Sequence, residues 1–183
     1  MSKDILVSIL IASFNAEKYI IELLESAKAQ THQRLELVLA DDHSNDRTKE
    51  LVLEWLGQNE GRFERVVTIF SENNQGTCKN LNGGLRACTG EYIKVIDADD
   101  ILYPYAIEEL LGTCLKENYE ILIGDVYWVQ DDGETYAEHH DNLAHMKEFY
   151  AMSAEEQYSD LLVENSVVCS VSQTTADKFC VVI

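Results

Sequence analysis

Residues 5–30, ILVSILIASFNAEKYIIELLESAKAQ, change from one apolar pattern to another within a few residues. The first eight, ILVSILIA (5–12), are almost continuously apolar, which predicts a strand buried on both faces of a parallel sheet. From Ala16 onward, apolar residues recur at helical spacing with Glu and Lys between them. We therefore expect a helix that runs to about Gln30, with Asn15 as its N-terminal cap.

The same alternation continues along the chain. Further strands are expected at 35–40 (LELVLA), 66–70 (VVTIF), 91–96 (EYIKVI) and 120–129 (EILIGDVYWV), and further helices at 48–56, 80–90 and 106–118. Asn45 or Asp46 is expected to cap the second helix, and Gly90 to close the third. Pro104 suits the first turn of the last helix. Alternating strands and helices predict an α/β fold, an α/β/α sandwich with a mostly parallel sheet.

Composition limits the class of protein. The chain has 183 residues, 46% of them hydrophobic and 26% charged, with a single Pro, which is typical of one compact globular domain with a small appendage. A disordered or fibrous protein is excluded. No apolar stretch approaches the roughly 18 residues that span a bilayer, and the N-terminus lacks the pattern of a secretory signal. We therefore expect a cytoplasmic protein.

The net charge limits which partners the protein can bind, and the cysteine spacing limits its zinc sites and disulfides. Lys and Arg total 14 against 33 Asp and Glu, a net charge of -19 that repels phosphate backbones and anionic lipid. Nucleic acid is therefore not expected as a partner. The five cysteines are widely spaced and form no CxxC pair, so we expect reduced thiols rather than zinc ligands or disulfides.

Polar residues follow three of the expected strands. They are ASFN (12–15), DDHSND (41–46) and DADD (97–100). Because ligands bind beyond the carboxyl ends of parallel strands, these loops are expected to converge on one site. Their carboxylates would repel one another, so a divalent cation is the economical explanation. Asp97 and Asp99 are separated by a single residue, and in extended chain this spacing turns both side chains to the same side. Their hard oxygen ligands suit Mn²⁺ or Mg²⁺.

Each of these residues also has a plain structural interpretation. DADD could be an acidic turn before the helix near Pro104, and Asp42 a turn or cap residue rather than a ligand of a nucleobase N–H or ribose hydroxyl. Phe14 could be a core aromatic rather than a ring that stacks on a base. The chain has no glycine-rich phosphate loop of the GxGxxG or GxxxxGK[ST] type, so we expect a metal ion to hold phosphates instead.

Three separated segments resemble a known family. VSILIASFNAEKYIIELLESAKAQT, ELVLADDHSNDRT and NQGTCKNLNGGLRACTGEYIKVIDADD resemble the N-terminal half of the family 2 glycosyltransferases, which have the GT-A fold. The resemblance covers residues 7 to about 110. It implies a nucleotide-sugar donor, most often a UDP-sugar, and Mn²⁺ or Mg²⁺ as cofactor.

The resemblance also implies roles for individual residues. Ala12 and Phe14 would line the nucleobase pocket and Asp42 would bind the base. Asp97 would bind the ribose or a metal-bound water, and Asp99 would bind the metal itself. The resemblance thus places both Asp97 and Asp99 at the metal site.

The chain departs from the family pattern at several of these positions. Ala12 stands where Pro or Thr is usual, and Phe14 where Tyr is usual. With Asn82 taken as the Asn of the middle motif, the preceding Arg is replaced by Leu81, and Lys79 is its nearby substitute. Lys79 and Asn82 therefore join the predicted donor-binding residues.

The implied reaction is inverting transfer of the sugar to a glycan or lipid-linked acceptor. We expect a donor-binding core at residues 1–130 and part of an acceptor-side region at 131–183, in a chain that is truncated. Glu155, Glu156 and Glu164 are candidates for the catalytic base by position only, so the catalytic residue is unassigned.

The alternative function is a nucleotide-sugar-binding domain without turnover. A sugar nucleotidyltransferase would need a Gly- and Arg-rich loop after the first strand, and a phospho-receiver domain would place its acidic pair there; SFNAEK fits neither. A lipid-linked acceptor would bring the cytoplasmic protein to the inner face of the membrane as a peripheral protein.

Overall fold

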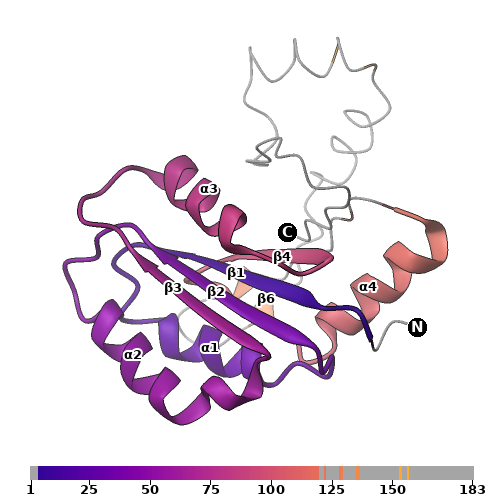
Figure 1. The fold of residues 1–183 in the computed structure, drawn as a ribbon, viewed down its shortest axis with the longest axis horizontal. Helices are drawn as coiled ribbons and strands as arrows, with labels where there is room; N and C mark the ends of the chain where they lie inside the picture. Colours follow the sequence, from indigo (N-terminus) through magenta and orange to yellow (C-terminus); the bar gives the residue numbers. More distant parts are fainter. Residues whose placement is uncertain are drawn as a thin grey trace. The chain divides into compact units, whose positions relative to one another are not determined.

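The structure is a computed structural model that describes residues 4–119, 122, 128–129, 135–136, 153 and 156. These residues belong to two compact units. Residues 4–119 and Leu122 lie in the first unit, and the other described residues lie in the second. The first unit contains the sheet and the helices drawn in Figure 1.

The sheet of the first unit has four strands, all parallel, in the order β3-β2-β1-β4. Its strands are β1 (Val7–Ser13), β2 (Leu35–Asp41), β3 (Arg65–Phe70) and β4 (Tyr92–Asp97). Ala12 of β1 pairs with Ala40 of β2 on one side and with Asp97 of β4 on the other. The carboxyl ends of these three strands therefore meet at one edge, as the sequence predicted.

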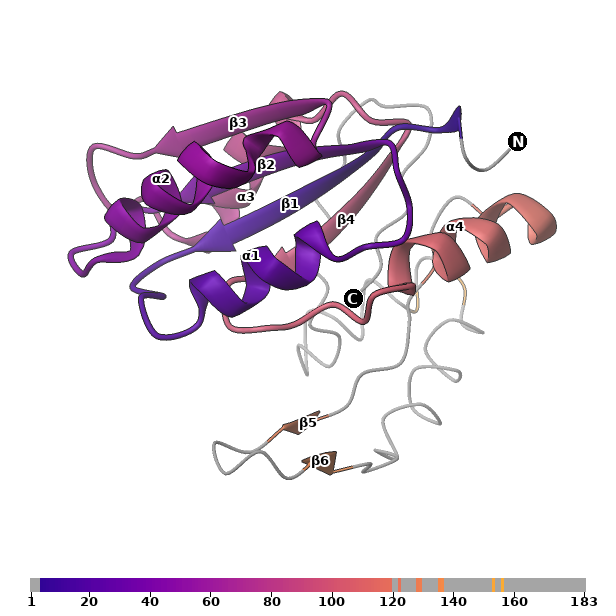
Figure 2. The same ribbon diagram turned by 90° about the horizontal axis from the view of Figure 1, so that it is seen from below.

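Helices cover both faces of this sheet (Figures 1 and 2). They are α1 (Ile20–Lys28), α2 (Thr48–Asn59), the short 3-10 helix η2 (Glu60–Arg62), α3 (Thr77–Ala87) and α4 (Ala106–Glu117). The side chains of α1, α2 and α4 share one core with Ile9 and Ile11 of β1. Leu81 of α3 shares a second core with Leu10. Because β1 is buried on both faces, its run is continuously apolar, and the predicted α/β/α sandwich is confirmed.

The start of α1 differs from the prediction. Asn15 does not cap the helix, which begins at Ile20. Asn15 instead has a left-handed backbone (φ 52°), and its side-chain oxygen accepts a hydrogen bond from the backbone N–H of Asn45. A tertiary contact therefore takes the place of the local cap. At the start of α2, the N-cap position is Arg47 rather than Asn45 or Asp46, and Asp46 accepts a hydrogen bond from the backbone N–H of Thr48 from just outside the helix.

The bounds of α3 also differ from the prediction. The helix begins three residues earlier than expected, at Thr77, and Gly90 does not close it, because it ends at Ala87. Gly90 has another physical role. A Cβ at this position would lie 2.6 Å from the backbone nitrogen of Ser8, so a glycine is needed where the chain passes close to β1.

Part of the second unit is described. Strand β5 (Trp128–Val129) pairs antiparallel with β6 (Thr135–Tyr136). The expected strand at 120–129 therefore lies largely outside the described residues.

Within the described part of the chain, the helices are too short or too polar to cross a membrane. Cys78, Cys88 and Cys114 form no disulfide among the residues that the structure describes, and the other two cysteines lie outside those residues.

Candidate functional site

An open pocket of about 430 Å³ lies at the carboxyl ends of β1, β2 and β4. Five of the seven residues predicted from the sequence line it: Ala12, Phe14, Asp42, Asp97 and Asp99. They come from three loops that are far apart in the sequence. The volume falls in the range of ordinary small-molecule sites, and the polar lining offers hydrogen-bond acceptors to a ligand.

The other two predicted residues lie elsewhere on α3. Lys79 is exposed and Asn82 is half-buried, and neither is among the pocket-lining residues. The helix instead presents Thr77 and Asn80 to the pocket. Residues three positions apart lie on the same face of a helix. Had the sequence indicated that the helix starts at Thr77, Thr77 and Asn80 could have been predicted as a pair facing the pocket.

Asn80 is the residue that sequence reasoning missed. It is buried, and its amide nitrogen donates to the backbone oxygen of Ala40 at 2.7 Å. This bond fixes the orientation of the amide, because only the nitrogen can donate. Its Oδ1 is a buried acceptor without a hydrogen-bond partner in the described part of the chain. Asn80 thus joins the start of α3 to β2 at the floor of the pocket.

Asp97 and Asp99 supply the negative charge of the pocket. Asp97 is the last residue of β4, and Asp99 lies in the turn that follows. Partial desolvation and the nearby charge of Asp99 raise the pKa of Asp97. Desolvation, Asp99 and Asp97 together raise the pKa of Asp100. Holding several ionised carboxylates this close together at neutral pH therefore costs free energy, unless a cation offsets their charge.

The donor set of this acidic turn fits Mn²⁺ or Mg²⁺. Carboxylate oxygens are the hard ligands that these cations prefer, and such ions usually keep several water molecules or phosphate oxygens as further ligands. Among the described residues, no group of three or more Asp, Glu, His or Cys side chains is arranged as a complete metal site. Asp97 and Asp99 would therefore hold the ion together with oxygens from a bound ligand and water.

Asp42 is buried at the wall of the pocket and anchors the loop in front of α3. Its Oδ1 accepts the backbone N–H of Gln75 at 2.8 Å, and its Oδ2 accepts that of Gly76 at 2.7 Å. Gly76 has a φ of 86°, a conformation that favours glycine. Each carboxylate oxygen has a further lone pair, so Asp42 can hold this loop and still accept from a ligand.

The neighbouring Asp41 forms hydrogen bonds with a different set of residues. Its carboxylate accepts hydrogen bonds from the hydroxyl of Ser13 at 2.8 Å and from the backbone N–H of Ser44 at 2.9 Å. The bond from Ser13 joins the ends of β1 and β2, and the bond from Ser44 holds the loop that follows β2. Phe14 follows Ser13 and is 48% exposed, although it is a large aromatic residue. It is therefore not a core aromatic, and its ring is available to a ligand in the pocket.

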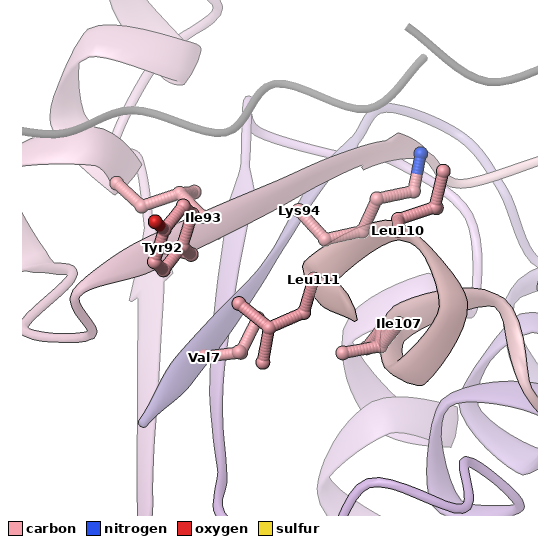
Figure 3. A pocket seen from close by; sticks show the side chains of 7 residues that line it. All are labelled: Val7, Tyr92, Ile93, Lys94, Ile107, Leu110 and Leu111. Carbon is pink, nitrogen blue, oxygen red and sulfur yellow. The ribbon is translucent and has the colours of Figure 1, made fainter. Parts of the chain in front are cut away.

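A second, apolar pocket lies under β4 against α4 (Figure 3). It is lined by Val7, Tyr92, Ile93, Lys94, Ile107, Leu110 and Leu111. Its volume of about 20 Å³ suits little more than one water molecule. This pocket is a packing gap in the core and not a second ligand site.

One of the three candidate bases is described. Glu156 accepts hydrogen bonds from the hydroxyl of Ser153 at 2.7 Å and from its backbone N–H at 2.8 Å. Both bonds lower the pKa of Glu156. In return, the backbone N–H of Glu156 donates to the hydroxyl oxygen of Ser153 at 3.4 Å, so the pair forms a capping box, which is a structural role. Glu155 and Glu164 lie outside the described residues.

Comparisons with known proteins show which family the chain resembles. The chain is 32% identical over 132 residues to the glycosyltransferase GlyG of Streptococcus pneumoniae, covering 72% of this chain and 42% of that protein. Residues 1–349 of S. aureus TarS in complex with UDP match with a TM-score of 0.59 and 26% identity, covering 66% of this chain and 36% of that 1–349 chain.

A third match is the mannosyltransferase PcManGT of Pyrobaculum calidifontis in complex with GDP-Man and Mn²⁺. Its TM-score is 0.52 at 28% identity, and the match covers 60% of this chain and 31% of that one. The chain spans less than half the length of these relatives. The family described as "Glycosyl transferase family 2" matches residues 8–173, almost the whole sequence. With this match, the parallel sheet and the likeness to GT-A glycosyltransferases, the chain belongs to glycosyl transferase family 2.

Proposed function

We propose that this chain binds the nucleotide-sugar donor of a metal-dependent, inverting glycosyltransferase, with a UDP-sugar as donor. The observation that carries the proposal is the pocket at the carboxyl edge of the sheet. It gathers an exposed aromatic ring, Phe14, a buried acceptor, Asp42, and the acidic pair Asp97 and Asp99. A nucleoside diphosphate has a flat base, hydroxyl and N–H donors and a charged diphosphate, which match these three features.

The nucleoside half of the donor would lie between the first two loops. The face of Phe14 can stack on a base, and Asp42 can accept a base N–H, which uracil offers at N3. Ala12 lies between Ala40 and Asp97 in the register of the sheet, and its small side chain leaves room for the ribose. The complex of TarS with UDP supports this choice of donor.

The diphosphate would lie over the acidic turn. Two carboxylates repel a diphosphate, so Asp97 and Asp99 are compatible with it only when a divalent cation lies between them. Asp97 and Asp99 would hold Mn²⁺ or Mg²⁺ there, and the ion would offset the charge that develops on the departing diphosphate. The complex of PcManGT with GDP-Man and Mn²⁺ supports a metal ion in this family of folds.

In the proposed reaction, an acceptor hydroxyl attacks the anomeric carbon from the side opposite the diphosphate. The new glycosidic bond forms as the bond to the diphosphate breaks, and a carboxylate base takes the hydroxyl proton. We assign the base and the acceptor site to residues 131–183, and Glu156 is the weakest of the three candidates because Ser153 engages its carboxylate. The donor core is residues 1–130.

We also propose a glycan or a lipid-linked sugar as acceptor, with the protein in the cytoplasm. A lipid-linked acceptor would bring it to the inner membrane face. The net charge of -19 argues that such contact is made through the acceptor and not through anionic headgroups.

Isothermal titration calorimetry tests the donor assignment. UDP, CDP, GDP and ADP are each titrated into the chain in the presence of Mn²⁺, with uridine as a control that lacks the diphosphate. The proposal predicts the tightest binding for UDP and much weaker binding for uridine. Equal affinities for the four diphosphates would contradict a uracil-specific pocket, and no binding of any of them would contradict the proposed function.

A further inference from the structure

The loop after β1 and the loop after β2 are joined by hydrogen bonds in both directions. Side chains of residues 44–48 accept backbone N–H groups of residues 15–17: Asn15 to Ser44 Oγ at 2.8 Å, Ala16 to Thr48 Oγ1 at 2.8 Å and Glu17 to Asp46 Oδ2 at 3.0 Å. Side chains of residues 15–17 return two such bonds: Asn45 N–H to Asn15 Oδ1 at 2.8 Å and Arg47 N–H to Glu17 Oε2 at 2.9 Å. The two loops therefore form one cross-linked platform.

Asn15 stands out among these residues. Its backbone N–H and its side-chain oxygen both bond to the second loop, at Ser44 and Asn45. Its φ of 52° is a left-handed conformation, which costs free energy in a residue other than glycine and persists only when its surroundings hold it. Asn15 is exposed and contributes nothing to the core, so packing does not explain this conformation.

The position of Asn15 connects the two residues proposed to recognise the base. Phe14 precedes it directly, and on the other side of Phe14 the hydroxyl of Ser13 bonds to Asp41 at 2.8 Å. The exposed ring of Phe14 is thus bracketed by two anchored residues. The partners of these two residues, Asp41, Ser44 and Asn45, flank Asp42 in the sequence, so these contacts hold the backbone of Phe14 against the segment that carries the Asp42 carboxylate.

We propose that Asn15 is a positioning residue for the nucleobase. Its side chain holds the first loop against the second, so that Phe14 and Asp42 present a preformed slot to a flat base. The inference rests on the proposed function, since it assumes that the slot takes the base of a nucleotide. Without the link, the ring must be ordered when the nucleotide binds, and affinity falls because that ordering costs entropy.

The chain allows the link to be cut without disturbing the backbone. Asn15→Gly keeps the left-handed conformation and the N–H that donates to Ser44, and removes only the acceptor of the Asn45 N–H. Asn15→Asp keeps that acceptor and also tolerates the left-handed region. Ser44→Ala cuts the second link, from the other loop, and replaces Asn15→Gly in the test if that variant does not fold.

The experiment is a double-mutant cycle, with UDP titrated calorimetrically in the presence of Mn²⁺ and melting temperature as a check on folding. Asn15→Gly is expected to weaken UDP binding by roughly 3- to 10-fold, the range of one hydrogen bond, and Asn15→Asp by less than about twofold. In the Phe14→Ala background, Asn15→Gly is expected to change affinity by less than about twofold, because the link acts through the ring.

Two outcomes overturn the inference. A lower melting temperature with unchanged UDP affinity would make Asn15 a purely structural residue. The same fold-loss of affinity with and without the Phe14 ring would show that Asn15 does not act through Phe14. Failure of the unmodified chain to bind UDP or any other nucleoside diphosphate would instead contradict the proposed function, and this inference with it.

Discussion

The carboxylate oxygen Oδ2 of Asp42 lies 2.7 Å from the backbone nitrogen of Gly76. This bond joins the end of β2 to the residue just before α3, across more than thirty positions of sequence. Together with the bond to Gln75, it holds the loop that forms one wall of the pocket. One side chain thus holds the wall of the proposed donor site in place and also lines that pocket.

Asp42→Asn should therefore weaken both the fold and the site. An amide has a single acceptor oxygen, so its NH₂ group must face one of the two backbone N–H groups. Losing a hydrogen bond to a charged, buried acceptor costs about 1.5–3 kcal/mol. Urea unfolding and UDP titration measure the two effects separately, and a variant with unchanged stability and unchanged affinity contradicts this dual role.

Phe14→Ala should affect binding and not folding. The ring is 48% exposed, so its removal takes little surface out of the core. Stacking of an aromatic side chain on a base is worth about 1–3 kcal/mol, and UDP affinity should fall by that amount. The opposite pattern, a large drop in melting temperature with normal affinity per folded molecule, would assign Phe14 to the core.

Replacing either of two adjacent glycines of α3 by alanine should change the stability of the protein, in opposite directions at the two positions. A Cβ on Gly84 would lie 2.3 Å from the buried Cδ1 of Leu10, whereas a Cβ on Gly83 meets no atom within 4 Å. Gly84→Ala should therefore destabilise the protein by about 1–3 kcal/mol through overpacking. Gly83→Ala should stabilise it by up to about 1 kcal/mol, since alanine favours helix. Chemical unfolding checks both, and equal effects would mean that α3 does not pack as described.

Glu36 should contribute acid-sensitive stability. It is fully buried and accepts hydrogen bonds from Ser8, Arg65 and the backbone N–H and hydroxyl of Thr89. Burial alone would raise the pKa of Glu36, but these bonds outweigh burial and lower it. Because the folded pKa is below the unfolded one, this stability is present above the ordinary pKa of about 4.3 and is lost as the pH falls through the folded pKa.

Glu36→Gln should cost about 2–3 kcal/mol at neutral pH and flatten the acid side of the stability curve. Glu64→Gln is the matched control, because its ion pair with Arg34 is largely exposed and should change stability little. Unfolding free energies measured across the acid range separate the two residues. Parallel curves for Glu36→Gln and the unmodified chain would show that this buried carboxylate is not coupled to folding.

The fold and the meeting of three strand ends at one pocket could be predicted from the sequence for a clear physical reason. The apolar run at 5–12 is long enough to identify a strand buried on both faces. Once the strands are parallel, their ends must meet at one edge. That geometry alone brings Phe14, Asp42 and Asp97 together, without knowledge of any side-chain contact.

The details that sequence reasoning missed depend on tertiary contacts. The segment that contains the start of α3, NNQGTCKNLNGG (73–84), is poor in strong helix formers, so its local pattern does not mark where the helix starts. The structure places that start beside the bond between Asp42 and Gly76, and Asn80 rather than Asn82 then lines the pocket. Asn15 likewise looks like a cap until the second loop is in place.

The metal dependence of UDP binding tests the central claim most directly. UDP is titrated calorimetrically into the unmodified chain and into Asp99→Asn, with Mn²⁺ added or removed by excess chelator. The account predicts that the unmodified chain binds UDP only with Mn²⁺. Asp99→Asn should lose about 1.5–3 kcal/mol of this metal-dependent affinity, the value of one contact to a charged group. Equal UDP affinity in Mn²⁺ and in chelator, or an Asp99→Asn variant that binds as tightly as the unmodified chain, would contradict it.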